Sequence, residues 1–370
     1  MEVRGSCGKR FESVREEFER NFSHRGDVGA SFAATVQGEF VVDLWAGRRD
    51  GANKLPWEED TIVCVFSVSK TMTALCALVL VDRGELSFDD LVTEYWPEYG
   101  QNGKESTRVR HVMGHTAGVP DFGERLTHAE LYDWDHVIRV IERQAASWVP
   151  GESCRYHALT QGFIIGELVR RISGLSLGEF FRANIAIPLC ADFHIGLPSE
   201  HFGRAGEMIK GTSMPQKLVR YMRDQHGASP SVRPPITNST AFRRAELPSV
   251  NGHGNARSIV RVQTPVANGG NAFGVNLIGQ STVDQIFREQ GVIKAMDAQH
   301  GIGYGLDGPL VRLIPKGARS SFWVGGGGSF VLLDHTNRVC MAYAMNQMNF
   351  DFFGDERGTS LVKAFYKGLG

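Results

Sequence analysis

Ser67 and Lys70 stand three residues apart in the stretch VFSVSKTMTAL at residues 65–75. On a helix, residues three apart lie on one face, with Cβ atoms about 5–6 Å from each other. A serine hydroxyl is a weak nucleophile at neutral pH, and it needs a base within hydrogen-bond reach, which a neutral lysine amine can supply. The spacing therefore predicts a nucleophilic serine at the first turn of a helix, where free main-chain N–H groups can stabilise an oxyanion.

The residues on either side of this pair are apolar, with Val65 and Phe66 before it and Met72 and Ala74 after it. A lysine buried among them would lose its proton readily, because burial disfavours the charged ammonium. The competing interpretation is a helix cap followed by a surface lysine, and the motif alone does not separate the two. Ser69 is the weaker candidate nucleophile, because no lysine follows it three residues later.

The composition is that of a globular protein of 370 residues, with 42% hydrophobic residues and a formal net charge of -1. A chain of this length favours two lobes. The near-neutral charge balance argues against nucleic acid as a partner, because a basic stripe is missing. Six scattered cysteines without a C-x-x-C pair do not form a disulfide framework. We see no secretory signal and no apolar run of 18 residues, so we expect a cytoplasmic enzyme that does not bind a membrane.

Hydrophobic periodicity and turn residues place helices and strands along the chain. We expect helices over residues 10–23, 128–146, 158–173 and 356–368, a serine-bearing helix that ends near Arg83, and strands over 29–36, 39–46, 321–324, 329–333 and 339–345. Pro265 makes a regular helix after Thr264 doubtful, because proline lacks the main-chain donor. The stretch 200–250 has little periodicity and reads as a segment that wraps over a site or contacts a partner.

The two chain ends look alike, since each has a helix and strands, and the middle is helical. The expected fold class is α/β (α+β): one antiparallel sheet built from both chain ends, flanked by helices, with a mostly helical lobe inserted. Residues 1–85 and 296–370 would form the sheet domain, and residues 86–295 the helical domain with long loops. The active site would lie in the cleft between them.

Four ordered motifs carry a resemblance to a known superfamily. The S-x-x-K pair is followed by H-T-A-G-V at residues 115–119, by P-G-E-S-C-R-Y at 150–156 and by W-V-G at 323–325. In this order they resemble the serine β-lactamase and penicillin-binding-protein superfamily, over about residues 28–350. Ala158 stands where that superfamily has the asparagine of Y-x-N, and Trp323 replaces the lysine of K-T-G. Both departures resemble the family VIII carboxylesterases, the branch of esterases similar to class C β-lactamases.

The resemblance implies a β-lactamase/transpeptidase-like fold, no cofactor and no metal. It implies that Ser67 is acylated and that Lys70 holds or relays the serine proton. Tyr156 would be the partner base, and later the acid that protonates the leaving alcohol. The main-chain N–H groups of Ser67 and Gly326 would form the oxyanion hole, since glycine lets a backbone approach a ligand closely.

Three further residues are candidates for contact with the substrate. Trp323 could line an apolar acyl or alcohol pocket, or it could simply pack in the sheet. Gly325 lies beside the oxyanion glycine, and His157 follows Tyr156. For His157 the competing interpretation is a histidine behind the site or on the surface.

Three other histidines are candidates for a metal site or for the rim of the cleft. His111 and His115 are four apart, but no acidic residue follows the first as in H-E-x-x-H, so we expect no zinc site. His253 lies between two glycines and could be at the rim of the cleft or play a structural part.

The prediction is a serine carboxylesterase that acts through an acyl-enzyme on small to medium esters. Three alternatives stay open. An acyltransferase could use the same acyl-enzyme, as the statin-forming transesterases of this superfamily do. A β-lactamase or D,D-peptidase is disfavoured by Ala158 and Trp323, and a non-catalytic member could bind a partner or assemble. The expected partner is a small-molecule ester or acyl substrate, and the sequence leaves a homo-oligomer open.

Overall fold

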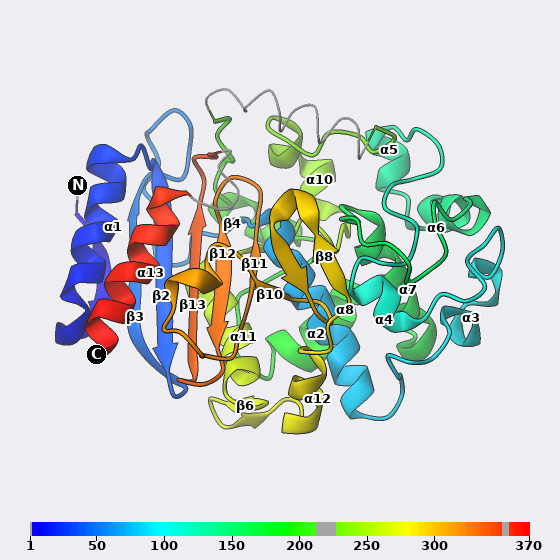
Figure 1. The fold of residues 1–370 in the computed structure, drawn as a ribbon. Helices are drawn as coiled ribbons and strands as arrows, with labels where there is room; N and C mark the ends of the chain where they lie inside the picture. Colours follow the sequence, from blue (N-terminus) through cyan, green and yellow to red (C-terminus); the bar gives the residue numbers. More distant parts are fainter. Residues whose placement is uncertain (1, 212–226, 350–354) are drawn as a thin grey trace.

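The computed structural model describes residues 2–211, 227–349 and 355–370 (Figure 1). Within these residues, nine strands form one antiparallel sheet in the order β1-β3-β2-β13-β12-β11-β10-β9-β8. The strands are β1 (Arg4–Cys7), β2 (Gly29–Val36), β3 (Glu39–Gly47), β8 (Gly291–Ile293), β9 (Ala298–His300), β10 (Gly305–Asp307), β11 (Ser320–Val324), β12 (Phe330–Asp334) and β13 (Val339–Met345).

The two ends of the chain meet at the centre of the sheet, where β2 pairs with β13 and Ala33 lies opposite Ala342. Both strands are buried along almost their whole length. Their continuous small and apolar residues fit this position, because a strand covered on both faces does not alternate between polar and apolar side chains. The expected antiparallel sheet from both chain ends, flanked by helices, is confirmed.

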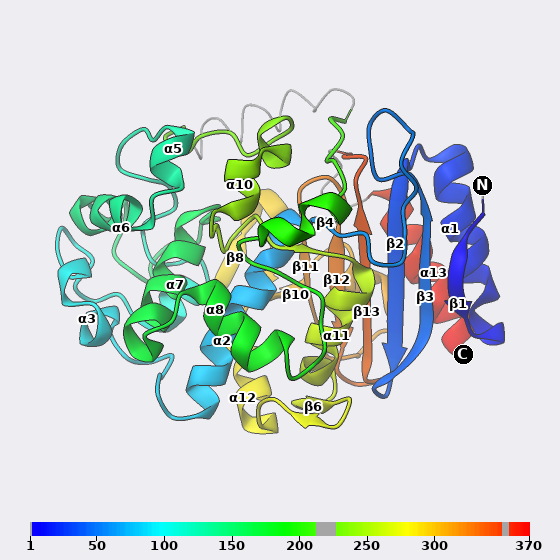
Figure 2. The same ribbon diagram turned by 180° about the vertical axis from the view of Figure 1, so that it is seen from behind.

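Helices cover both faces of the sheet (Figures 1 and 2). On one face, α1 (Glu12–His24) packs against α13 (Glu356–Leu369), and on the other face α11 (Ala256–Ala267) packs on β2, β12 and β13. The apolar stripe of α1 explains its place, since Val14 and Phe18 are four apart and fully buried. The first and last helices of the chain therefore lie side by side on the same face of the sheet.

The helical part of the described chain surrounds α2. Its helices are α2 (Ser69–Asp82), α3 (Val92–Tyr95), α4 (Val109–Met113), α5 (His128–Leu131), α6 (Trp134–Arg143), α7 (Thr160–Ser173), α8 (Leu177–Phe181), α10 (Thr240–Arg244) and α12 (Gln280–Gln285). Residues 69–80 of α2 are all buried, and α7, α8 and α12 pack around it. A helix that is apolar on every side belongs in the interior, so α2 forms the central rod of the molecule.

Two expectations about helices are wrong. The single helix expected over 128–146 is two helices, α5 and α6, because Thr127 and Asp133 each cap the start of a new one. The expected break after Thr264 is also absent: α11 continues through Pro265 to Ala267. The proline lies in the last turn, so it removes a single hydrogen bond, and the burial of the last turn of α11 compensates for that loss.

The edges of the sheet and two small ladders consist of short strands that the sequence does not predict. β1 extends one edge of the sheet and β8–β10 extend the other, while β4 (Val63–Cys64) pairs with β5 (His253–Gly254), and β6 (Asn271–Ala272) with β7 (Val275–Asn276). Strands of two to four residues carry too little alternation to be read from sequence. β8 begins at Gly291, five residues before the predicted start of the second part of the sheet domain at residue 296. The division into two lobes stays a prediction. The segment 200–250 lies partly outside the described residues.

Candidate active site

Ser67 lies in a sharp turn between β4 and α2. A 3₁₀ turn, Phe66–Val68, leads directly into α2, so Ser67 precedes the helix by two residues. Phe66 has a positive φ of 47°, a left-handed conformation that costs energy for a side chain of this size. The hydroxyl of Ser69 donates to the carbonyl of Phe66 and accepts from the N–H of Gly252. Ser69 therefore stabilises the strained turn, which is a structural part and not that of a nucleophile.

Lys70 lies directly behind the serine and is only 2% exposed. Its Nζ donates to the main-chain carbonyls of Ala158 at 2.8 Å and Ser249 at 3.1 Å. No carboxylate forms a salt bridge with it among the described residues. Burial therefore holds the pKa of Lys70 well below its usual value. Burial thus favours the neutral amine, which is the form that can accept a proton.

Tyr156 completes the group from the loop between α6 and α7. Its hydroxyl lies 2.7 Å from the Oγ of Ser67, and the Nζ of Lys70 lies 4.8 Å from the centre of its ring. Ser67 and Tyr156 are both partly exposed, whereas Lys70 is buried. A substrate can therefore reach the two hydroxyl groups while the amine stays shielded from water.

His115 holds Tyr156 in place, a role that the spacing of His111 and His115 does not predict. Its carbonyl accepts from the N–H of Arg155 at 3.1 Å, and its Nδ1 accepts from the N–H of His157 at 3.2 Å. The residues on both sides of Tyr156 are thus bonded to His115, whose ring also lies 5.1 Å from that of Tyr156. The signal was present, because His115 opens the H-T-A-G-V motif, but only the fold shows what the ring contacts.

Gly326, the predicted oxyanion glycine, and its neighbour Gly325 follow β11, which packs on the serine turn Phe66–Val68. A Cβ atom at Gly325 would meet the carbonyl oxygen of Val65 at 2.3 Å, and one at Gly326 would meet the ring of Phe66 at 3.4 Å. Only glycine permits the first approach. Within the described residues, the main-chain N–H groups of Ser67 and Gly326 have no hydrogen-bond partner. Their role as oxyanion donors stays a prediction.

Aromatic rings form a buried, uncharged wall beside the two hydroxyl groups. Trp323 is 2% exposed, stacks on His115 with ring centres 5.6 Å apart, and meets the edge of His300 at 5.1 Å. Burial lowers the pKa of His300 to about 4 and holds that of His115 well below its usual value. Both rings are therefore neutral at pH 7, and the contact of Trp323 with a substrate stays a prediction.

His157 is fully buried behind this wall. Its Nδ1 donates to the carbonyl of Arg155 at 2.6 Å, and its Nε2 accepts from the N–H of Val119 at 3.2 Å. Both ring nitrogens thus bind the main chain, and the contact of His157 with a substrate stays a prediction. His253 is also buried, on β5 opposite Cys64, and burial lowers its pKa to about 3. It contributes to the interior and does not line a rim.

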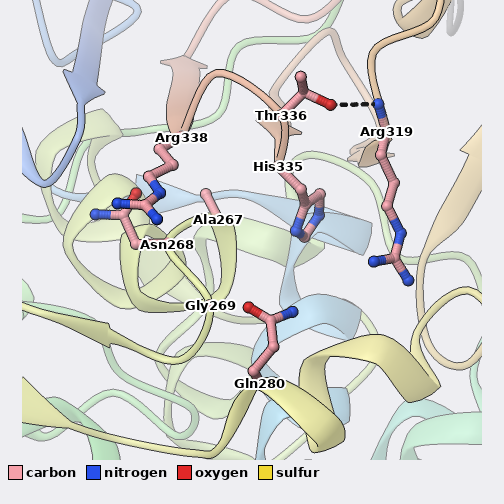
Figure 3. Close-up of a pocket in the computed structure, with 8 residues that line it drawn as sticks. All are labelled: Ala267, Asn268, Gly269, Gln280, Arg319, His335, Thr336 and Arg338. Atoms are coloured by element: carbon pink, nitrogen blue, oxygen red, sulfur yellow. Dashed lines mark hydrogen bonds between the residues drawn. The ribbon is translucent and has the colours of Figure 1, made fainter.

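The structure also has a hollow of about 160 Å³ at the other end of β11, lined by Arg319, His335, Thr336 and Arg338 among others (Figure 3). None of its eight lining residues is a serine, lysine or tyrosine. The hydroxyl of Thr336 already accepts from the N–H of Arg319 at 2.9 Å. This hollow therefore lacks the nucleophile and base that Ser67, Tyr156 and Lys70 bring together.

Among the described residues, no cluster of three or more His, Cys, Asp or Glu could hold a metal ion.

The antiparallel sheet and the serine–lysine–tyrosine group define a serine hydrolase of the β-lactamase superfamily. The Beta-lactamase family matches this chain over residues 18–364, so the chain belongs to that family. The predicted resemblance is confirmed. A crystal structure of a family VIII carboxylesterase is 36% identical, with both chains covered over 100% of their length and a TM-score of 0.92.

Two other relatives are similar over most of their length. The esterase/beta-lactamase LipL of Mycobacterium tuberculosis is 31% identical, over 94% of this chain and 83% of its own. The structure of a penicillin-binding protein homologue from Caulobacter crescentus is 32% identical, with 100% of both chains covered and a TM-score of 0.92. The family thus includes esterases and penicillin-binding proteins, and the residues of the site must separate the two.

Proposed function

We propose that this protein is a serine carboxylesterase that cleaves small to medium esters through an acyl-enzyme on Ser67. The observation that carries the proposal is the 2.7 Å contact between the hydroxyls of Ser67 and Tyr156, in front of the buried amine of Lys70. Nucleophile and base must lie within about 2.6–3.2 Å for direct proton transfer, and this pair does. The similarity to a family VIII carboxylesterase supports the same activity.

The reaction has two halves. In the first, Tyr156 takes the proton of Ser67 and passes its own hydroxyl proton to the buried amine of Lys70, and the serine oxygen attacks the ester carbonyl. The N–H groups of Ser67 and Gly326 stabilise the oxyanion, and Tyr156 returns the proton to the departing alcohol. In the second half, water loses a proton to Tyr156 and Lys70 and attacks the acyl carbon. The bond from that carbon to the oxygen of Ser67 then breaks, Tyr156 returns the proton to the serine oxygen, and the acid leaves.

The aromatic wall favours an uncharged acyl or alcohol group. Trp323 replaces the lysine with which related enzymes hold a substrate carboxylate, and the neighbouring rings of His115 and His300 are neutral. Desolvating a carboxylate against such a wall is costly. β-Lactams and D-Ala-D-Ala peptides carry that carboxylate, so their turnover is disfavoured. A plain ester has no such charge to desolvate.

The test is intact-protein mass spectrometry after mixing with p-nitrophenyl acetate or butyrate, with release of p-nitrophenol followed in parallel. The wild type is expected to release p-nitrophenol and to carry an acyl adduct on Ser67, and Ser67→Ala to do neither. The proposal would be contradicted if the folded wild type released no p-nitrophenol and carried no acyl adduct. An adduct that persists in water until an alcohol is added would indicate an acyltransferase, and rapid turnover of nitrocefin a β-lactamase.

Location and assembly stay predictions. All six cysteines are free, which favours a reducing compartment such as the cytoplasm. Among the described residues no helix is long and apolar enough to cross a membrane. Size-exclusion chromatography with light scattering would decide whether the protein forms a homo-oligomer.

A further inference from the structure

The four consecutive glycines after β11 pose a physical problem for the proposed oxyanion hole. Glycine has the greatest backbone freedom of any residue, so the loop 325–328 would not by itself hold the N–H of Gly326 in one direction. An oxyanion donor contributes only if it points at the position of the developing charge before the reaction begins. Within the loop, the N–H of Gly328 donates to the carbonyl of Gly325 at 3.2 Å, on the peptide group that carries the N–H of Gly326. This single long bond leaves the rest of the loop to be fixed by contacts from outside it.

Two buried side chains hold this loop from opposite sides. We propose that Ser329 and Arg357 are positioning residues that set the geometry of the oxyanion hole. The inference rests on the proposed function, because it assigns these residues to the same reaction. Neither side chain touches the substrate; each acts through the main chain of the glycine loop.

Ser329 joins the loop to the serine turn. It is 1% exposed, and its Oγ donates to the carbonyl of Val65 at 2.9 Å, two residues before the nucleophile. Its own carbonyl accepts from the N–H of Gly325 at 2.7 Å. One residue therefore fixes the separation of the two predicted donors, the N–H of Ser67 and the N–H of Gly326.

Arg357 holds the other side of the loop. It is 2% exposed, and its Nη2 donates to the carbonyl of Gly327 at 2.8 Å, which also accepts from the N–H of Asn349 at 2.9 Å. Gly327 follows the oxyanion glycine directly. Fixing its carbonyl restricts the rotation of the peptide groups around Gly326.

The guanidinium is itself fixed by two carboxylates. Asp355 bonds it at 2.5–3.0 Å and Asp27 at 2.7 Å, and the hydroxyl of Tyr343 donates to Asp27. A Cβ atom at Gly328 would meet Asp355 at 2.4 Å, so the loop lies directly against this network. Buried, bidentate arginine contacts of this kind are stiff, because the planar fork allows few alternatives.

The experiment compares Ser329→Ala with a matched control, Ser321→Ala. Both serines are buried on the β11–β12 hairpin, and each hydroxyl makes one side-chain hydrogen bond, in the case of Ser321 with the Nε2 of His335 at 2.9 Å. Ser321 lies at the far end of β11 from the site. The measured quantities are kcat and KM for p-nitrophenyl butyrate, the pH profile, and the melting temperature.

For Ser329→Ala we expect kcat to fall about tenfold with KM within about twofold, because a misplaced donor weakens the transition state more than substrate binding. The acidic limb of the pH profile should not move, since Lys70 and Tyr156 are untouched. Ser321→Ala should keep wild-type kcat even if both variants lose the same few degrees of melting temperature. Equal kcat in the two variants, a loss in KM alone, or a moved pH limb would overturn the inference.

Arg357→Lys gives a second, independent readout. Lysine keeps the charge but cannot reach both carboxylates and the carbonyl of Gly327 at once, so kcat should again fall more than KM changes. If this variant does not fold, Ser329→Ala decides alone. A wild type that forms no adduct on Ser67 would refute the proposed function and this inference with it. A wild type that reacts, together with Ser329→Ala acylating at the wild-type rate, would refute only this inference.

Discussion

Two buried basic side chains support the active site, Lys70 behind the nucleophile and Arg357 against the glycine loop, and their surroundings act on their charge in opposite ways. Lys70 and Arg357 are each 2% exposed. Lys70 bonds two carbonyls and no carboxylate, and burial holds its pKa well below the usual value. Burial also acts against the charge of Arg357, but Tyr343, Asp27 and Asp355 together raise the pKa of Arg357 above its usual value.

The difference shows that the hydrogen-bond and ionic partners of a buried basic side chain, and not burial alone, decide whether it carries a charge. With neutral dipoles as partners, burial favours the neutral amine of the lysine, which is the form that can accept a proton from Tyr156 and Ser67. With two carboxylates, the arginine stays charged and serves as a rigid support for the main chain. The first arrangement suits a base, and the second suits the positioning of a loop.

The largest expected effect is on activity, from Lys70→Met. Removing the amine should lower kcat/KM at least about 10³-fold while the protein stays folded, because nucleophile, lysine and tyrosine act as a unit. The matched control is Lys104→Met. Lys104 is also buried and donates to three main-chain carbonyls, of Gln101, Glu142 and Gln144, but it lies outside the site. If Lys104→Met lost as much activity as Lys70→Met, the effect could not be assigned to the position of Lys70 behind the nucleophile.

The second largest effect is on stability, from Arg357→Met. This substitution leaves two buried carboxylates without their cation, so the free energy of unfolding should fall by about 3–5 kcal/mol in urea titrations. Arg312→Met removes an exposed arginine that also pairs with two aspartates, Asp297 and Asp307, and should change little. An unfolding free energy for Arg357→Met equal to that of Arg312→Met would show that the network does not stabilise the fold.

A smaller effect concerns stability and pH. Unfolding exposes Lys70, whose pKa then rises to about 10.4, so unfolding takes up a proton at any pH between the folded and unfolded values. The stability of the wild type relative to Lys70→Met should therefore increase with pH across that window and level off above about 10.4. Denaturant titrations of both proteins from pH 7 to 10 would check the sign. A flat or falling difference would mean that Lys70 is charged in the folded protein.

The smallest effect tests the neutral wall. Trp323→Phe shortens the aromatic surface without adding charge, so the ratio of rates for butyrate and acetate esters should change by about two- to tenfold. When the two esters compete for the enzyme, the relative amounts of butyryl and acetyl adduct on Ser67 give this ratio directly. An unchanged ratio would mean that Trp323 only packs in the sheet.

The sequence was informative where a motif or a long periodic run carried the signal. The sheet strands near both ends, the apolar α2 and the pair of Ser67 and Lys70 could all be read from residue types and spacing. The short strands β1 and β8–β10 could not, because pairing with neighbours defines them. The end of α11 was misjudged, since local propensity favoured a break at Pro265 and burial against the sheet prevailed.

By itself, the sequence determined the class of chemistry: a serine with a lysine three residues later in an apolar run, followed in order by three further motifs. Tertiary structure decided what the remaining residues do. It brought the hydroxyl of Tyr156 to 2.7 Å from that of Ser67 across 89 residues of chain. It also made His115 the support of that tyrosine, and placed Ser329 and Arg357 behind the glycine loop. Such roles depend on contacts between distant segments, and no local pattern of residues records them.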